Sequence, residues 1–313
     1  MNLYASSTLR RIAMLIALLA TAATARSAQA AACCVSASAF GVGRLLVWED
    51  FAVGLFVGHA RSVGQWSSSR ELRLYDGRFA DGLTTFEPYA MVRVIERLQL
   101  SARVPLRIND RSSAGMYQVA GGFGDVQAGA RVEALSPGQF RELPSLAFHA
   151  LVTAPSGRRA EQVSGPLGAG VTGRGAWVLT FALETEYTWL PWYLRLDAAV
   201  SVPFGFRRSD TREWQLYGPL VSVMLSGGRE LVPGKLVASL ALQAEWEGPV
   251  RINGALVARS EAYAFTVAAS LSWRVEPHWT LLGSISSSVW PGGFGANRDA
   301  RVSFNLGGRY GYF

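Results

Sequence analysis

Alternation of apolar and polar side chains is the feature of this chain that most constrains its fold. In Arg259–Arg274 every second residue from Tyr263 to Trp273 is apolar, and the residues between them are mostly small or polar. The same alternation runs through Gln99–Ile108 and Trp192–Phe204. Successive side chains of a strand point to opposite faces, so one face of these strands suits lipid and the other water. After residue 30 no apolar stretch is long enough for a transmembrane helix.

The lengths of the connections favour a membrane barrel over a soluble sandwich, because outer-membrane barrels alternate short periplasmic turns with longer extracellular loops. Short links are expected at Ile95-Glu96, Ser136–Arg141, Leu190-Pro191, Arg229–Pro233 and Glu276-Pro277. Longer links are expected at Trp66–Gly82, Asn109–Gly122, Pro155–Gly173, Gly205–Arg212, Gly248–Val257 and Pro291–Ala300. The sequence therefore predicts an all-β fold, a transmembrane antiparallel up-and-down β-barrel of about twelve strands over residues 50–313, with both ends periplasmic.

The first thirty residues have the parts of a cleaved secretory signal. Arg10 and Arg11 precede the apolar run Ile12–Ala23, and Ala28-Gln29-Ala30 forms a small-residue cleavage site. Residues 1–30 are thus a predicted signal peptide for secretion, and the predicted location of the mature barrel is the bacterial outer membrane. Residues 31–49 form an N-terminal segment that either lies in the periplasm or enters the lumen as a partial plug. Within it Cys33 is either an ordinary residue or a lipidation site, although Ala30 replaces the expected Leu-like residue.

The charge pattern does not indicate a nucleic-acid partner. Removing the signal lowers the formal net charge from +7 to about +4, and the basic residues are spread along the chain without runs. Aromatic residues lie near the ends of the predicted strands, which is typical of an interfacial girdle in contact with outer-membrane lipid. They are Trp177, Tyr187, Trp189, Trp192, Trp214, Trp246, Trp273, Trp279, Tyr310 and Tyr312.

The final strand, Arg301–Phe313, resembles the C-terminal signal of outer-membrane barrels. That signal has a polar residue, a glycine two positions later, and two aromatic residues spaced by one near the end. The matching positions are Asn305, Gly307, Tyr310 and Tyr312, followed by the terminal Phe313. The resemblance implies that the barrel assembly machinery is a partner.

Two internal stretches resemble an outer-membrane transporter family labelled as the MetA pathway of phenol degradation. The first is Gly122–Arg131, which contains the pattern Gly-Phe-Gly-Asp; the second is Leu143–Gly157, followed by Gly168 and Gly170, with Ser156 where the family usually has Thr. The resemblance spans Phe86–Phe313. It implies a barrel for uptake of small, often hydrophobic or aromatic compounds, and it transfers no substrate-binding residue.

Because alternate residues of a strand share one face, many charged side chains are expected on the inner face of the strands. The candidates for lining the lumen are Arg103, Arg107, Asp125, Arg131, Glu133, Glu184, Glu186, Arg195, Asp197, Glu245, Arg301 and Arg309, with Glu261 and Arg274 by the same argument. They either line a polar path for solutes or form a salt-bridged network that fills a narrow lumen. We therefore expect a monomeric channel for an unknown small solute, with a non-conducting structural barrel or a surface-binding barrel as the alternatives.

An enzyme is not expected. His59 and Ser62 are three residues apart on one strand, so their side chains point to opposite faces and cannot pair. The His-x-Ser pattern is absent at His59, His149 and His278, and no histidine pair has metal-ligand spacing on one strand. No catalytic residue, metal or cofactor is predicted.

Overall fold

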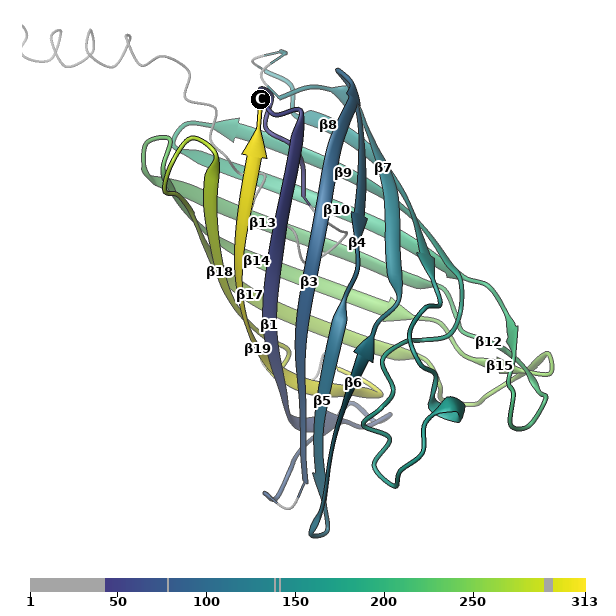
Figure 1. Cartoon of the computed structure of the whole chain (residues 1–313). Coiled ribbons are helices and arrows are strands. Elements are labelled where there is room, and N and C mark those ends of the chain that lie inside the picture. The colour runs from purple at the N-terminus through teal and green to yellow at the C-terminus, as the bar shows by residue number, and fades with distance from the viewer. Residues whose placement is uncertain (1–42, 78, 138, 141, 290–294) are drawn as a thin grey trace, which may run out of the picture.

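The computed structural model describes residues 43–313 except 78, 138, 141 and 290–294. The predicted signal peptide, Cys33 and most of residues 31–49 lie outside these ranges. The strands form a closed antiparallel barrel with twelve strand positions, which confirms the predicted fold (Figure 1). The only helix in the described ranges is the short turn η2 (Ala160–Gln162), and none there is long and apolar enough to cross a membrane.

Ten of the positions are single strands, in the order in which the chain meets them. They are β1 (Phe51–Trp66), β3 (Phe79–Ile95), β8 (Ser145–Ala154), β9 (Val178–Trp189), β10 (Trp192–Pro203), β13 (Leu220–Val232), β14 (Leu236–Glu247), β17 (Ala262–Arg274), β18 (Trp279–Ser287) and β19 (Arg298–Tyr312). The other two positions each hold a broken strand, β4 (Leu98–Arg103) with β5 (Leu106–Ser113), and β6 (Met116–Phe123) with β7 (Val126–Leu135).

The first and last strands close the barrel. β1 pairs with β3 on one side and with β19 on the other, so that Phe51 lies opposite both Val92 and Tyr312. The short turns gather at the end that carries the C-terminus, which is the periplasmic end in barrels of this kind (Figure 1). The opposite end carries the longer links and is the extracellular end.

The break in the wall falls where proline removes ladder hydrogen bonds. β3 pairs with β5 up to Phe86 and with β4 from Tyr89, and Pro88 lies between. Pro105 separates β4 from β5, and Gly124-Asp125 separates β6 from β7. Proline cannot donate to a neighbouring strand, so the ladder changes partner at this level.

The prediction of a loop at Asn109–Gly122 is wrong. β5 and β6 pair along their whole length as a hairpin, and its tip is Ala114-Gly115, with φ of 49° and 83°. Two successive positive φ angles form the tight turn that matches strand twist, so the strands continue beyond the barrel wall. The other extracellular links also contain short strands: β2 (Leu72–Leu74) beside the end of β1, and a small sheet of β11 (Phe206–Arg207), β12 (Trp214–Leu216), β15 (Arg251–Ile252) and β16 (Ala255–Leu256).

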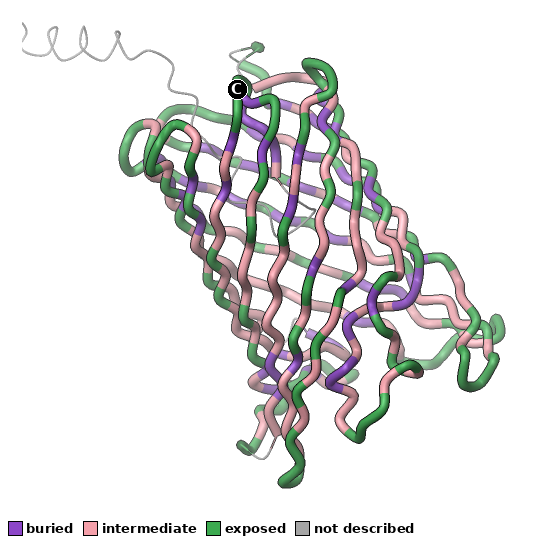
Figure 2. Tube along the Cα trace, in the orientation of Figure 1, coloured by how far each residue is buried: buried purple, intermediate pink, exposed green. Residues whose placement is uncertain are grey.

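The barrel is apolar outside and polar inside. Exposed and buried residues alternate along the strands in Figure 2, and on β10 the exposed residues are Trp192, Leu194, Leu196, Val200 and Val202. Exposed tryptophans lie at both ends of the strands, namely Trp189, Trp192, Trp273 and Trp279 at the turns and Trp177, Trp214 and Trp246 at the loops. An outer surface of this kind is stable against lipid, with the indole rings at headgroup depth.

Candidate functional site in the barrel lumen

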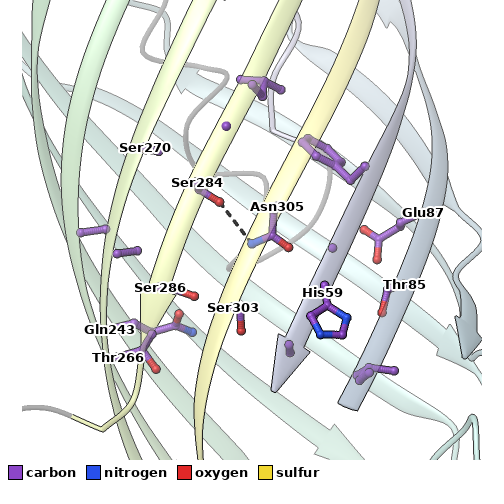
Figure 3. Close-up of a pocket in the computed structure, with 18 of the residues that line it drawn as sticks. His59, Thr85, Glu87, Gln243, Thr266, Ser270, Ser284, Ser286, Ser303 and Asn305 are labelled. Carbon is purple, nitrogen blue, oxygen red and sulfur yellow. Dashed lines mark hydrogen bonds between the residues drawn. The ribbon is translucent and has the colours of Figure 1, made fainter. Parts of the chain in front are cut away.

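A chamber of about 320 Å³ lies inside the barrel, between β1, β3, β4 and β5 on one side and β13, β14, β17, β18 and β19 on the other. One wall is rich in hydroxyl and amide groups (Figure 3). These groups belong to Ser226, Gln243, Thr266, Ser270, Ser284, Ser286, Ser303 and Asn305. The facing wall contributes Thr85 and the charged side chains of Glu87, Arg103 and Arg107.

Part of the hydroxyl-rich wall is held by side-chain hydrogen bonds. Between neighbouring strands, Asn305 donates from Nδ2 to Ser284 Oγ at 3.2 Å, and along β14 Gln243 donates from Nε2 to Glu245 at 3.0 Å. Within the described chain Ser286, Ser303 and Thr266 form no such bond, which leaves their hydroxyls available to the chamber. Hydroxyls of this kind both donate and accept, so this wall can solvate either type of group.

The charged wall is only partly neutralised. Arg103 donates to Glu87 at 2.9 Å and forms a salt bridge with it. Arg107 donates from Nη1 to the main-chain carbonyl of Thr172 at 2.9 Å, whereas its Nε is buried and has no hydrogen-bond partner. The chamber therefore has one ion pair and one arginine whose hydrogen-bond acceptor, within the described residues, is a main-chain carbonyl.

A buried ionic network fills the lumen beside β7–β10, with Glu184 at its centre. The Glu184 carboxylate lies 3.0 Å from Arg131, 3.1 Å from Arg195 and 3.0 Å from His149 Nε2. Arg195 also bonds Asp197 at 2.9 Å, and Arg131 bonds Glu133. Removing one member of such a network leaves an uncompensated buried charge, which costs about 3–5 kcal/mol in measured cases.

The N-terminal segment is joined to this network. Arg44 contacts Glu186 at 3.1 Å, and both side chains are almost fully buried. The amide of Leu45 donates to Gln99, whose own amide donates to Glu133 at 3.3 Å. Residues 44–46 thus reach into the lumen beside the ionic network.

Further contacts hold the segment at the periplasmic end. Arg93 of β3 donates to the carbonyls of Leu46 at 2.6 Å and Glu49 at 3.0 Å, and the Glu49 carboxylate pairs with Arg309 of β19. Leu45 packs against Tyr89 and Met91. Leu46 packs against Leu282, which also lines the chamber, so the segment lies directly below it.

The long link after β8 is folded over β5 and β6. Arg111 donates to the carbonyls of Leu167 and Gly168, and Asn109 donates to those of Ala169 and Val171. With the bond from Arg107 to Thr172, three inward side chains of β5 hold one stretch of main chain. Arg107, which lines the chamber, thereby connects the chamber to this stretch.

The Gly- and Pro-containing motifs form a clamp at the break in the wall. Asp125 accepts hydrogen bonds from the amides of Gly157 at 2.9 Å and Arg174 at 2.6 Å. Ser156 donates its hydroxyl to the carbonyl of Gly124 and accepts from the amide of Val126. The motifs that carry the family resemblance thus fix the ends of the long link to the strand break.

The predicted lumen residues occupy several distinct environments. Arg103 and Arg107 line the chamber, Glu245 adjoins it, Asp125 is in the clamp, and Arg309 holds the N-terminal segment. Arg301 contacts Asp299 at 2.7 Å and Asp81 at 3.5 Å near the extracellular rim. The remaining six form the ionic network: Arg131, Glu133, Glu184, Glu186, Arg195 and Asp197.

Sequence reasoning missed the partners of several of these residues. Arg44 and Glu49 precede the first strand, so the alternation of apolar and polar residues does not indicate which way their side chains point. Glu87 follows the run Leu83–Phe86 and directly precedes Pro88, and the alternation of that strand could have identified it as inward-facing. His149 contacts Glu184, a partner that its sequence neighbourhood does not indicate.

The predicted assembly signal has structural roles in the closing strand. A side chain at Gly307 would meet the ring of Phe56 at 2.5 Å, and that ring stacks on Tyr89 at 5.2 Å between centroids. Tyr310 and Phe313 pack against His278, and Tyr312 is exposed on the outer surface.

No histidine of the described chain has the partners of a nucleophilic site. His59 contacts Thr84, His149 contacts Glu184, and His278 contacts the carbonyl of Gly311. None of them bonds both a hydroxyl and a carboxylate. In the same ranges no group of three or more His, Cys, Asp and Glu side chains could hold a metal ion.

The barrel has a closed wall, an apolar exterior and a polar interior. These three features together define a transmembrane β-barrel of the outer-membrane type. No family model matches the sequence, and no curated protein does. Among solved structures it is similar to the COG4313 outer membrane channel from Pseudomonas putida F1, at 14% identity and a TM-score of 0.70, covering 86% of this chain and 97% of that one. The β domain of the Bordetella autotransporter BrkA is also similar, at 12% identity and a TM-score of 0.49, with 84% and 100% covered. At such identities the likeness is one of fold.

Proposed function

We propose that the protein is an outer-membrane channel that passes small solutes through its lumen. The observation that carries the proposal is the chamber of about 320 Å³, enclosed by the barrel wall and lined from both sides by polar groups. Pockets that hold small molecules commonly have volumes from about 300 Å³ upward. The named channel of similar fold is consistent with this function.

The solutes in this proposal are small and include compounds with a hydrophobic or aromatic body. Apolar side chains contribute to the chamber beside the hydroxyl groups, namely Phe56, Leu83, Met224 and Leu282. The resemblance to the phenol-degradation family favours the same solutes. When the apolar part of a solute is buried against these side chains, its removal from water stabilises the bound state by about 25 cal/mol per Å² of apolar surface.

In this proposal the N-terminal segment is a partial plug at the periplasmic end. Residues 1–30 are removed as a signal peptide, and the remaining segment enters the lumen through the contacts of Arg44 and Glu49. The barrel assembly machinery recognises the closing strand through Asn305, Gly307, Tyr310, Tyr312 and Phe313. The protein then works as a monomer in outer-membrane lipid, without a catalytic step.

Solute flux into liposomes tests the proposal. Mature protein refolded into vesicles should admit small neutral and charged solutes, and exclude solutes much larger than the chamber. A barrel that is folded by its resistance to protease, but admits no solute of any size, would contradict the channel function.

A structural barrel without conductance is the second candidate. The observation in its favour is the ionic network around Glu184, which occupies the lumen beside β7–β10 with buried side chains. A surface-binding barrel is the third, in which the long extracellular links recognise a partner. Deleting residues 67–78 would abolish partner binding in that case and leave flux unchanged.

A further inference from the structure

Two arginines on the inner face of the barrel lack a carboxylate partner within the described part of the chain. Arg107 lines the chamber and donates to the carbonyl of Thr172, and its Nε is buried without a partner. Arg274 lies at the periplasmic end of β17, where its Nε and Nη2 are buried without a partner. By contrast, a carboxylate contacts each of Arg103, Arg111, Arg131, Arg195, Arg301 and Arg309.

The chamber therefore has an excess of positive charge. The charged side chains among its described lining residues are Arg103, Arg107 and Glu87, two cations and one anion, which gives the lining a net charge of +1, while the carboxylates of Glu245 and Asp125 lie just outside the lining. A cleft with low-dielectric walls concentrates ions of the opposite sign. A guanidinium presents several N–H donors in one plane, and that geometry matches a carboxylate better than a spherical anion.

We propose that the chamber selects small organic anions, above all monocarboxylates, and that Arg107 is the residue that attracts them. This inference rests on the proposed channel function and adds the substrate class. The carboxylate binds on the wall that carries Arg107 and Arg103. The short apolar body of the solute then lies against Phe56 and Met224, and the hydroxyl-rich wall forms hydrogen bonds with the other polar groups of the solute.

Arg274 provides a second attraction point on the way to the periplasm. Its guanidinium lies 5.4 Å from the ring centre of Trp48, which belongs to the N-terminal segment. Within the described chain no salt bridge of Arg274 is present, so its guanidinium keeps N–H donors for an anion. A carboxylate that leaves the chamber thus meets another arginine before the periplasmic end, beside the N-terminal segment.

Ion selectivity of the refolded mature chain in a planar bilayer is the first test. Under a salt gradient, the zero-current potential gives the permeability of chloride relative to potassium. We expect a preference for the anion. Glu87→Gln removes the one carboxylate among the described residues that line the chamber and leaves Arg107 intact, so it should raise the anion preference about threefold. Arg107→Gln should abolish the preference.

The contact of Arg107 with Thr172 requires two further variants. Arg107→Lys keeps the charge and changes the geometry of that contact, so it should retain chloride preference if charge is responsible. Asp210→Asn removes a carboxylate from an exposed extracellular link, where Asp210 pairs with Arg208 at 2.7 Å, and should leave selectivity unchanged. Cation preference of the wild type, or no effect of Glu87→Gln, would overturn the inference.

Solute competition tests the chemical class directly. Benzoate and benzamide have nearly the same shape and differ in charge. Benzoate should reduce the chloride current at a concentration about tenfold lower than benzamide, and Arg107→Gln should remove the difference. If the wild type conducts and the two compounds reduce its current equally, the anion site is contradicted but the channel function is not. A folded protein without any current contradicts the proposed channel function itself.

Discussion

Arg44 and Glu186 form a buried salt bridge at 3.1 Å, although 142 residues separate them in the chain. The contact joins the segment before the first strand to the carboxylate-rich side of the lumen. It places Leu46 next to Leu282, at the floor of the chamber. The N-terminal segment and the chamber are therefore connected through identifiable side chains.

Weakening this contact should open the channel. In Arg44→Ala the segment loses its anchor on Glu186, so we expect a larger mean conductance or longer open times in single-channel recordings. The matched control is Arg208→Ala, which removes an arginine from an exposed pair outside the lumen. Recordings of Arg44→Ala that match the wild type would show that the segment does not limit the current.

Glu184 should be the most stabilising carboxylate of the lumen. Glu184→Gln leaves the buried Arg131 and Arg195 with fewer opposite charges, so the free energy of unfolding should fall by about 3 kcal/mol. Denaturant titration of the refolded barrel, followed by tryptophan fluorescence, measures the change. Asp210→Asn should show no shift in the midpoint, and equal midpoints for the two variants would contradict the role given to Glu184.

The Asp125 clamp should protect the long extracellular link. Asp125→Ala leaves the amides of Gly157 and Arg174 without their acceptor, so trypsin should cleave the refolded protein faster after Arg158, Arg159 or Arg174. Ser156→Thr keeps the hydroxyl that bonds Gly124 and should digest like the wild type, whereas Ser156→Ala should digest faster. Digestion of Asp125→Ala at the wild-type rate would argue against the clamp.

Adjacent glycines of β19 should differ in their tolerance of a side chain. Gly307→Ala places a Cβ 2.5 Å from the ring of Phe56, whereas the nearest atom for Gly308→Ala is Leu281 Cδ2 at 3.9 Å. Overpacking of this kind costs about 1–3 kcal/mol, so only Gly307→Ala should lower the unfolding midpoint.

Refolding in detergent separates this packing effect from recognition, because no assembly machinery is present there. If Gly307→Ala refolds normally in detergent and yet fails to assemble in cells, the glycine acts as an assembly signal. Loss of yield in both settings supports the packing role. Identical stability of Gly307→Ala and Gly308→Ala would contradict the steric account.

The strands were predictable because the two faces of each strand meet different solvents. Leu194, Leu196 and Val200 could be assigned to the outer surface, since a period of two separates lipid from lumen. The same parity placed Arg195 and Asp197 together on the inner face, although which carboxylate each arginine meets depends on neighbours in other strands. Register between strands far apart in the chain is not encoded in alternation alone.

Other features have no periodic signal. Residues 44–49 carry no alternation, and their position depends on long-range contacts with Gln99, Arg93 and Arg309. The hairpin of β5 and β6 was mistaken for a loop because Asn109–Gly122 is rich in polar residues and glycine. Its strands are stable beyond the membrane because each residue has a partner across the Ala114-Gly115 turn.

The central claim is that the lumen conducts and that the N-terminal segment restricts it. Single-channel recording on the refolded mature chain, beside a variant that lacks residues 31–48, tests both parts at once. We predict discrete current steps in the mature chain and larger steps in the shortened one. Absence of current from both proteins, each shown to be folded, would contradict the channel and favour a structural barrel.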